Sequence, residues 1–526
     1  MRDHFVAVDV GTTSARAGIF TSDGRLLAKV RFPIRMQRGP GQHAEHSSED
    51  IWSATCQAVK SASEEAGIGA EQVAAIGFDA TCSLVVRDLE GGPLSISVVG
   101  DDEFDTVVWL DHRAIEQADR LSATGHPVLQ YSGGSLSPEM QIPKLMWLKE
   151  NMPDRWARIG YLFDLADFLT WRSTGSTARS QCTLTAKWNF LAHEREGWNG
   201  DFLRQAGLED LLERGNLPPR AQPVGAAIGP LTPSAAAELG LDTGCLVAPG
   251  LIDAYAGALG ALGAAANTGE LGRNLALIGG TSSCLVAFSQ APLPGRSLWG
   301  PYFEAGYPGH WLVEGSQSAT GALLDHVVRM HAAGGEPTSD LHDRIVRRIG
   351  ELRSIEGSRF GDEIHILPDF HGNRSPLADP RATGVISGLT LDTSFDGLCR
   401  VYWRTCVAIM LGLRHILETM QGYGYVTDTL HLAGGHVNNP LLVELCADVT
   451  HCRVRVPATR DAVLLGSAMV AAVSAGLYAD LAQAGAAMDQ GGRVQMPDAT
   501  RRAGYDRDYR RFLAMHRHRA ELEAIL

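Results

Sequence analysis

The sequence predicts an α/β fold that is duplicated within one chain of 526 residues. The run "FVAVDVGTTSARAGIF" (5–20) consists of an apolar strand, a glycine turn with two threonines, and a second apolar strand. The run "NLALIGGTSSCLVAF" (274–288) repeats this plan half a chain later. Strand-like and helix-like segments alternate around both runs. Because a single core stops growing near roughly 250–300 residues, we expect two domains, 1–250 and 251–526.

The first half shows local signals for helices and strands. A helix is predicted over 47–67, because Ser47 is a good N-cap, Asp50 follows three residues later and Gly67 provides a stop. A buried strand is predicted at 73–78, ending at Asp79, and the run 83–88 is predicted to follow as its hairpin partner. The segment "DTVVWLDHRA" (105–114) is predicted to be a strand that runs into a polar tip.

Later segments follow the same logic. The run "LVAPGLIDAYAGALGALGAAA" (246–266) predicts a strand, a Pro-Gly turn, and a helix that begins at Asp253. A strand, a turn and a helix are predicted again over 428–449. The uncharged segment 462–479 is rich in Ala, Gly and Ser, which favours a tightly packed buried helix over a membrane span.

Composition excludes several classes of function. The chain is 45% hydrophobic and 20% charged, as in an ordinary globular enzyme, and its formal charge is −14. That charge argues against nucleic acid and anionic membranes as partners. Nine cysteines without a C-x-x-C motif indicate reduced thiols and no zinc site. The segment "MRDHFVAVDV" enters a strand at once, so we expect no signal peptide and a cytoplasmic protein.

The two glycine turns suit phosphate chemistry. Glycine allows the backbone to approach a bulky anion closely, and threonine hydroxyls can donate to phosphate oxygens. Asp9 can hold a hard divalent cation there, whereas Ile278 occupies the equivalent position in the second copy. A hairpin with a polar tip explains one copy equally well, but the repeat favours phosphate binding. No Walker A motif is present, so this chemistry is not of the P-loop type.

Taken together, the motifs resemble the FGGY carbohydrate kinases. The resemblance follows the family's motif order in "VAVDVGTTSARAGIF", "GLIDAYAGALGA", "IGGTSSCLVAF" and "AGGHVNNPLLVELCADV". It implies the duplicated actin/hexokinase/Hsp70-like ATPase fold, with two domains and a central cleft. It also implies ATP and Mg²⁺ as cofactors, with Asp9 holding the metal, and suggests a homodimer.

The resemblance assigns roles to individual residues. Asp253 is expected to be the catalytic base, although a capping role at the start of its helix fits the spacing alone. The expected nucleotide-binding residues are Gly11, Thr12, Thr13, Gly280, Thr281, Gln317, Gly434, Gly435, Asn438 and Asn439. For Gln317 a plain helix-start role is equally compatible with the pattern, and asparagine at a helix start is also a favoured cap.

Sugar recognition is expected from the first domain. The expected substrate-binding residues are Thr81, Cys82, Trp109, Asp111, His112, Lys187 and Asp253. Glycerol kinases carry an Arg-Glu pair where this chain has Thr81-Cys82, which argues against glycerol. The strings "DATCSLV", "WLDHRA", "TAKWNF" and "LPDFHGNRSPLADP" look most like pentulose kinases, the subgroup that contains D-ribulokinases.

Other interpretations remain open at this point. Arg113 can pair with neighbouring charges, Lys187 can be a surface lysine, and Cys82 can be a small packing residue. A kinase for L-ribulose, xylulose or a tetritol is the main alternative to a D-ribulose kinase. A sugar or nucleotide sensor that keeps the fold without turnover has no need for Asp253. A structural ATPase of the actin or chaperone type predicts no sugar pocket.

Overall fold

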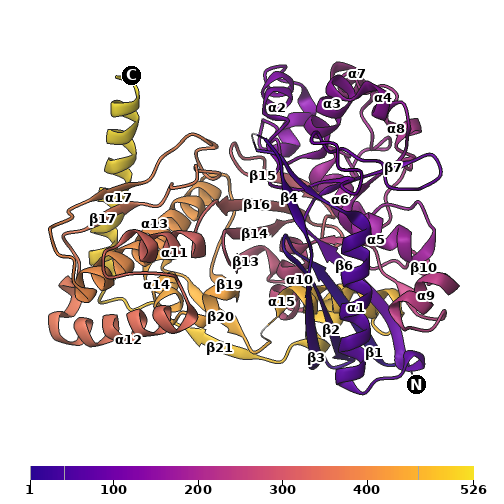
Figure 1. Ribbon diagram of the computed structural model, residues 1–526. Helices are drawn as coiled ribbons and strands as arrows, with labels where there is room; N and C mark the ends of the chain where they lie inside the picture. The colour runs from indigo at the N-terminus through magenta and orange to yellow at the C-terminus, as the bar shows by residue number, and fades with distance from the viewer. Residues whose placement is uncertain (1, 41, 460, 526) are drawn as a thin grey trace. The chain divides into compact units, whose positions relative to one another are not determined.

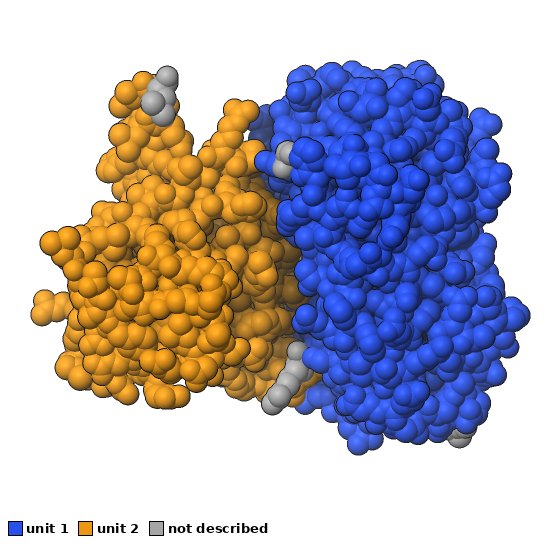
Figure 2. Space-filling model, in the orientation of Figure 1, with its two compact units in different colours: residues 1–271, 288–313, 461–490 blue, residues 272–287, 314–460, 491–526 orange. Residues whose placement is uncertain are grey.

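The computed structural model describes residues 2–40, 42–459 and 461–525. The chain forms two compact units, which Figure 2 distinguishes by colour. Unit 1 comprises residues 1–271, 288–313 and 461–490, and unit 2 comprises residues 272–287, 314–460 and 491–526. Unit 1 therefore continues past the expected boundary at residue 250 and includes two later segments of the chain.

Unit 1 contains two sheets and the helices that cover them (Figure 1). Its strands are β1 (His4–Val10), β2 (Ser14–Thr21), β3 (Leu26–Pro33), β4 (Met36–Arg38), β5 (Ala44–His46), β6 (Val73–Ala80), β7 (Leu84–Asp88), β8 (Thr106–Val107), β9 (Ile159–Asp164), β10 (Gly229–Pro230), β11 (Leu246–Val247), β12 (Leu251–Ile252) and β15 (Trp299–Phe303). Its α-helices are α1 (Ser48–Ala66), α2 (Ile115–Ser122), α3 (Gln141–Asn151), α4 (Pro153–Trp156), α5 (Leu165–Thr174), α6 (Gln181–Lys187), α7 (Gly200–Gln205), α8 (Leu211–Arg214), α9 (Pro233–Leu239), α10 (Asp253–Asn267), α15 (Ala462–Ser474) and α16 (Leu481–Met488).

The larger sheet of unit 1 has the order β10-β11-β6-β1-β2-β3, and β12 also pairs with β6. Strands β1, β6, β11 and β12 are parallel, while β2 and β3 continue as an antiparallel meander. Residues of α1, α5 and α9 pack against one face of this sheet. Helix α15 packs against β1 and β6 and against α10. The second sheet has the order β4-β5-β8-β7-β9. The hairpin predicted between 73–78 and 83–88 is therefore wrong, because β7 pairs with β8 and β9 and not with β6.

Unit 2 is built around a sheet that includes β14 (Ser283–Ser289), β13 (Asn274–Gly279), β19 (Thr429–Gly434), β20 (Arg453–Pro457) and β21 (Gly492–Gln495), in that order. Three elements lie partly in this unit: β14, whose last two residues belong to unit 1, β16 (Trp311–Gln317) and the 3-10 turn η3 (Leu271–Arg273). The other elements are β17 (His365–Leu367), β18 (Val385–Ser387), α11 (Gly321–Met330), α12 (Ser339–Glu356), α13 (Phe395–Gly422), η5 (Gly435–Asn438), α14 (Pro440–Thr450) and α17 (Arg502–Glu523). Helix α13 packs against α11, α12, α14 and α17.

Most local predictions are confirmed. The two repeated hairpins are β1–β2 and β13–β14, and each pair is antiparallel. The Ser47 side chain accepts a hydrogen bond from the Asp50 amide at the start of α1, and Gly67 ends that helix in the left-handed conformation. The uncharged segment forms the buried helix α15. All nine cysteines lie in the described part of the chain and are free thiols.

The strand expected over 105–114 is wrong in extent, since β8 covers only Thr106 and Val107. The chain leaves the sheet because the Asp111 amide donates to Val108 O (3.0 Å), which closes a turn. The membrane alternative for 462–479 receives no support: across the described ranges, no helix has both the length and the apolar character needed to span a bilayer.

Candidate active site

Three parallel strands of unit 1 end at the same edge of the sheet, and each delivers a carboxylate there. In β1 and β6, Asp9 is paired with Asp79, and in β12 and β6, Leu251 is paired with Asp79. Asp253 follows β12 directly as the first residue of α10. The topology therefore brings Asp9, Asp79 and Asp253 to one edge, although they are far apart in the sequence.

Asp253 is half-buried at the start of α10. Its Oδ1 accepts a hydrogen bond from the amide of Ala254 (2.7 Å). The N-cap position itself belongs to Ile252, which makes no side-chain cap. Negative charge is favourable near a helix N-terminus, so this position stabilises an ionised carboxylate. The geometry of Asp253 is therefore compatible with two roles, stabilisation of the helix end and acceptance of a proton.

Asp9 is almost fully buried and forms an ion pair with Arg16. The two residues are directly opposite in the β1–β2 hairpin. Arg16 also contacts the carboxylate of Asp461 (3.5 Å), which accepts a further contact from Lys29 (3.3 Å). Asp461 is the N-cap of α15. Arg16 of β2 and Lys29 of β3 thus form one network with the carboxylates of Asp9 and Asp461.

Asp79 is fully buried, and its Oδ2 accepts a hydrogen bond from the Ser467 hydroxyl of α15 (2.6 Å). Its Oδ1 is buried and makes no hydrogen bond to the protein. Burial raises the pKa of Asp79 well above its ordinary value, and the charge of Asp253 adds to the shift. The shift favours the neutral form of the Asp79 carboxyl over its ionised form.

The first glycine turn lies beside these carboxylates. The Gly11 amide donates to Ser14 O (3.0 Å), Thr12 is half-buried and Thr13 is exposed. The indole Nε1 of Trp109 donates to the hydroxyl of Thr12 (2.9 Å). This bond links a residue expected to bind sugar to one expected to bind phosphate. The sequence offers no signal for it because 97 positions separate the two residues.

Thr81 and Cys82 follow β6 and are both buried. The hydroxyl of Thr81 is 3.3 Å from that of Ser83. Burial raises the pKa of the Cys82 thiol to about 11, and the charge of Lys187 opposes this shift. The thiol is therefore neutral at pH 7 and has no nucleophilic character.

Lys187 is the last residue of α6 and is not a surface lysine, because only 3% of it is exposed. Its ammonium lies 4.1 Å from the centroid of the Trp299 ring, in a cation–π contact. The charge of Lys187 is felt at both Cys82 and Asp164. Two residues expected to bind sugar, Cys82 and Lys187, are thus close enough to interact.

Asp111 differs from its expected role. Its carboxylate is fully buried and accepts four hydrogen bonds at 2.7–2.9 Å, from Ala44 N, from Arg113 N, and from Nε and Nη2 of Arg113. Hydrogen bonding to the charged form lowers its pKa against the effect of burial. Because these bonds occupy its oxygens, Asp111 fixes the turn and does not offer an acceptor to a sugar hydroxyl.

His112 is half-buried, with Nε2 3.8 Å from the carboxylate of Glu139.

The second glycine turn belongs to unit 2. The Gly280 amide donates to Ser282 O (2.8 Å), while the amides of Thr320 and Gly321 donate to the carbonyls of Thr281 and Gly280. Gly280 and Thr281 are exposed. The start of α11 therefore holds this turn through its backbone.

The glycine pair at 434–435 lies next to this turn, because β13 and β19 are parallel and Gly279 is paired with Gly434. Gly434 has φ +81°, and a Cβ there would collide with the carbonyl oxygen of Gly279. Asn438 is exposed. Asn439 caps α14 by accepting from Leu441 N (3.0 Å), which satisfies the helix-start alternative.

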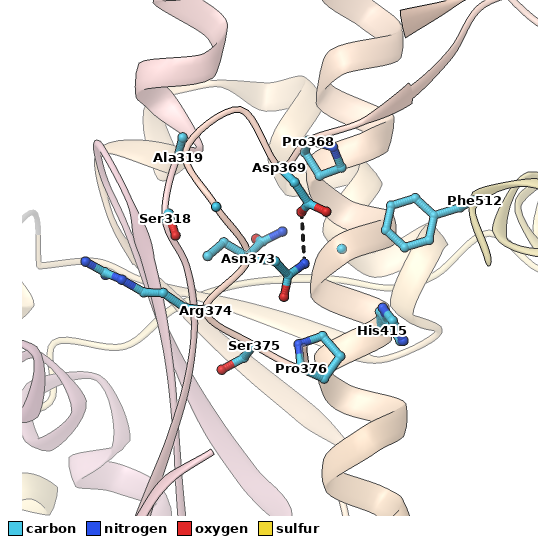
Figure 3. A pocket seen from close by; sticks show the side chains of 13 residues that line it. Ser318, Ala319, Pro368, Asp369, Asn373, Arg374, Ser375, Pro376, His415 and Phe512 are labelled. Atoms are coloured by element: carbon cyan, nitrogen blue, oxygen red, sulfur yellow. Dashed lines mark hydrogen bonds between the residues drawn. The ribbon is translucent and has the colours of Figure 1, made fainter. Parts of the chain in front are cut away.

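Gln317 is among the residues that line a small pocket of unit 2. Figure 3 shows this pocket with its neighbours Ser318 and Ala319 labelled. Its Nε2 donates to the carbonyl of Ile409 in α13 (3.0 Å), and Gly412 leaves room for that contact. Across the pocket, Asn373 Nδ2 donates to Asp369 (2.9 Å). The cavity of ≈ 20 Å³ has room for water only. The contact to α13 favours a packing role for Gln317.

Sequence reasoning missed several members of this site, and the reasons differ. Arg16 was predictable, since it lies opposite Asp9 in a hairpin whose strands were recognised. Ser467 and Asp461 are brought to the strand edge only by the packing of α15. Within the described residues, no three His, Cys, Asp or Glu side chains form a group able to hold a metal ion.

Comparison of the sequence with known proteins identifies the family to which the chain belongs. Residues 4–260 match the N-terminal domain, and residues 275–475 the C-terminal domain, of the FGGY family of carbohydrate kinases. An "FGGY carbohydrate kinase domain-containing protein" of Danio rerio is 43% identical, over 99% of this chain and 99% of its own. A D-ribulokinase of Saccharomyces cerevisiae is 34% identical, over 89% of this chain and 72% of its own.

Solved structures agree with this fold. A gluconate kinase from Lactobacillus acidophilus has a TM-score of 0.81 at 18% identity and covers 98% of each chain. A xylulose kinase from Rhodospirillum rubrum has a TM-score of 0.80 at 21% identity and covers 99% of each chain. The α/β architecture of the actin/hexokinase-like kinases is thereby confirmed. The protein is accordingly a sugar kinase, of a kind that uses ATP, and it belongs to the FGGY family of carbohydrate kinases.

Proposed function

We propose that the protein transfers the γ-phosphate of ATP to the terminal hydroxyl of a pentulose, with D-ribulose as the preferred acceptor. The observation that carries the proposal is the edge of the unit 1 sheet, where Asp253, Asp79 and Asp9 follow neighbouring parallel strands. The buried pair of Cys82 and Lys187 belongs to the same unit. The 34% identity with a D-ribulokinase supports the choice of sugar.

In this proposal Asp253 is the catalytic base. It accepts the proton of the terminal sugar hydroxyl while that oxygen attacks the γ-phosphorus and the bond to ADP breaks. Gly11 to Thr13 of unit 1 and Gly280 and Thr281 of unit 2 each offer turn amides and hydroxyls to phosphate oxygens. Gly434 and Gly435 leave backbone space for the nucleotide.

Mg²⁺ fits the chemistry of the donor set. Mg²⁺ is commonly held by one or two carboxylates together with substrate phosphates, so the lack of a three-residue cluster in the described ranges is compatible with it. Asp9 would hold the ion directly or through water, and its ion pair with Arg16 orients that carboxylate. When bound, the ion would neutralise charge on the phosphates.

Acceptor binding is assigned to Thr81, Cys82, Trp109, His112 and Lys187. The ammonium of Lys187 suits the carbonyl end of a ketose, and the turn at Thr81 offers a hydroxyl. Asp111 acts through the turn that it fixes. A site built to hydrogen-bond particular hydroxyls rejects analogues that lack them, so glycerol should be a poor acceptor.

The test is a coupled assay for ADP with D-ribulose, L-ribulose, xylulose, tetritols, glycerol and an aldohexose. We expect the highest kcat/KM with D-ribulose. Asp253→Asn should lower kcat by roughly 10²–10⁴-fold while ATP still binds. A higher kcat/KM for glycerol or an aldohexose than for every pentulose would contradict the acceptor. Normal kcat in folded Asp253→Asn, or a wild type that binds sugar without turnover, would contradict the mechanism.

A homodimer and a cytoplasmic location stay predictions.

A further inference from the structure

A buried carboxylate, Asp164, lies directly beside the turn that carries Thr81 and Cys82. It is the last residue of β9 and is fully buried. Strands β7 and β9 are antiparallel, and Asp164 is paired with Leu84. The amide of Leu165 donates to the carbonyl of Ser83 (2.9 Å). The register thus fixes Asp164 against the residues that follow Cys82.

Gln141 connects this carboxylate to the turn. Its Nε2 donates both to Asp164 Oδ2 (2.9 Å) and to the carbonyl of Cys82 (3.1 Å). Gln141 is fully buried as the first residue of α3. The other oxygen of each side chain, Asp164 Oδ1 and Gln141 Oε1, is buried without a hydrogen bond to the protein. Unsatisfied buried acceptors are costly, so their retention here requires an explanation beyond stability.

Two buried lysines provide the opposite charge. Lys144 is fully buried and its Nζ donates to the carbonyl of Val108 (3.3 Å). Lys187 stands over the Trp299 ring. Burial, followed by the charge of Asp167, raises the pKa of Asp164 to about 7, whereas the hydrogen bond from Gln141 and the charges of Lys187 and Lys144 oppose the shift. The charge on this carboxyl therefore changes within the range of pH in which a kinase works.

We propose that Asp164 is a positioning residue that sets the affinity for the acceptor sugar. It holds the Thr81-Cys82 turn through Gln141, which donates to both the carboxylate and the carbonyl of Cys82. The inference rests on the proposed function, in which Cys82 and Lys187 bind the sugar. Asp164 itself does not touch the acceptor. The titratable and charged groups that face Asp164 are Lys144, Lys187, Asp167, Cys82 and Cys182.

The experiment compares Asp164→Asn with Asp167→Asn in the full-length enzyme. Asp167 is a matched control, since it is equally buried, lies three residues away, and has a pKa raised by burial to about 6. Its carboxylate accepts from Ser180 N (2.7 Å) and from the Thr183 hydroxyl (2.6 Å), away from the Cys82 turn. Each variant is assayed for KM of D-ribulose, KM of ATP and kcat between pH 5.5 and 8.5.

For Asp164→Asn at pH 8 we expect the KM of the sugar to rise by about 10–100-fold, with the KM of ATP within about twofold. Wild-type kcat/KM for the sugar should fall as the pH drops through about 7, and we call this fall the acidic limb of the pH profile. In Asp164→Asn the acidic limb should be absent. Asp167→Asn should keep the limb but shift it to lower pH, because it removes a negative charge that raises the pKa of Asp164. A purely structural role would produce none of this pattern.

Gln141→Met serves as the second variant in case Asp164→Asn does not fold, because it removes both amide hydrogen bonds and keeps the carboxylate. It should raise the KM of the sugar and leave that of ATP unchanged. An unchanged KM for the sugar in either folded variant, or an equal rise in Asp167→Asn, overturns the inference. The proposed acceptor fails separately if the wild type uses another sugar better, in which case the same comparison is made with that sugar.

Discussion

Substitution of Gly434 by alanine should show whether the glycine at this position is needed for the stability of the folded chain or for the binding of ATP. Gly434 has φ +81° and ψ −162°, a region that residues with a Cβ rarely adopt. The cost of that conformation is about 1–3 kcal/mol, and the new Cβ would also collide with the carbonyl oxygen of Gly279. We therefore expect Gly434→Ala to lose about 2–5 kcal/mol of stability, or about 5–15 °C in Tm.

The neighbouring Gly435 provides a matched control. A Cβ at Gly435 would lie 3.8 Å from the same oxygen, which is an ordinary contact. Gly435→Ala should therefore change stability by less than about 0.5 kcal/mol, whereas its methyl group should raise the KM of ATP if the nucleotide approaches this backbone. Differential scanning calorimetry and an ATP titration measure the two effects. Equal stability of Gly434→Ala and wild type, or equal losses in both variants, would refute the reasoning.

Two further predictions concern the carboxylates of unit 1. Asp9→Ala should increase the Mg²⁺ concentration needed for half-maximal rate without changing sugar binding, and superimposable Mg²⁺ titrations of variant and wild type would exclude a metal role. Asp79→Asn should keep kcat at pH 7 within about threefold, because burial favours the neutral form of Asp79 and asparagine resembles that form in shape and charge. Since its folded pKa is raised, Asp79 contributes stability below pH about 4 that is lost as the pH rises, so Asp79→Asn should flatten the pH dependence of Tm. The same slope in both proteins would contradict a raised pKa.

Features with local causes were predictable from the sequence. The turn glycines and flanking apolar runs indicated β1–β2 and β13–β14, because both signals lie within about 15 residues. Ser47 and Gly67 marked the ends of α1 for the same reason. The strand expected over 105–114 ends early because the Asp111 amide donates to Val108 O and closes a turn, which the apolar pattern of the segment does not indicate.

Features created by packing between distant segments were not predictable. Ser467 reaches Asp79 across 388 positions of sequence, and Asp461 reaches Arg16 through the same helix. The uncharged composition of α15 correctly indicated a buried helix, but it could not indicate which strands the helix would contact. The sequence also suggested that Asp111 was available to a ligand, although its oxygens are occupied by neighbouring donors.

The two glycine turns share one backbone plan but differ in charge, and that difference has a physical reason. In unit 1 the turn lies beside Asp9, Arg16 and the buried Asp79, whereas Ile278 stands at the position of Asp9 in unit 2. The phosphates of ATP are strongly negative, so each carboxylate placed near them raises the electrostatic cost of binding. One carboxylate is sufficient to hold a cation, and a second would add repulsion without a further metal to offset it. Under the proposed function, both turns need the glycine and the threonine, whereas only one turn needs the acid.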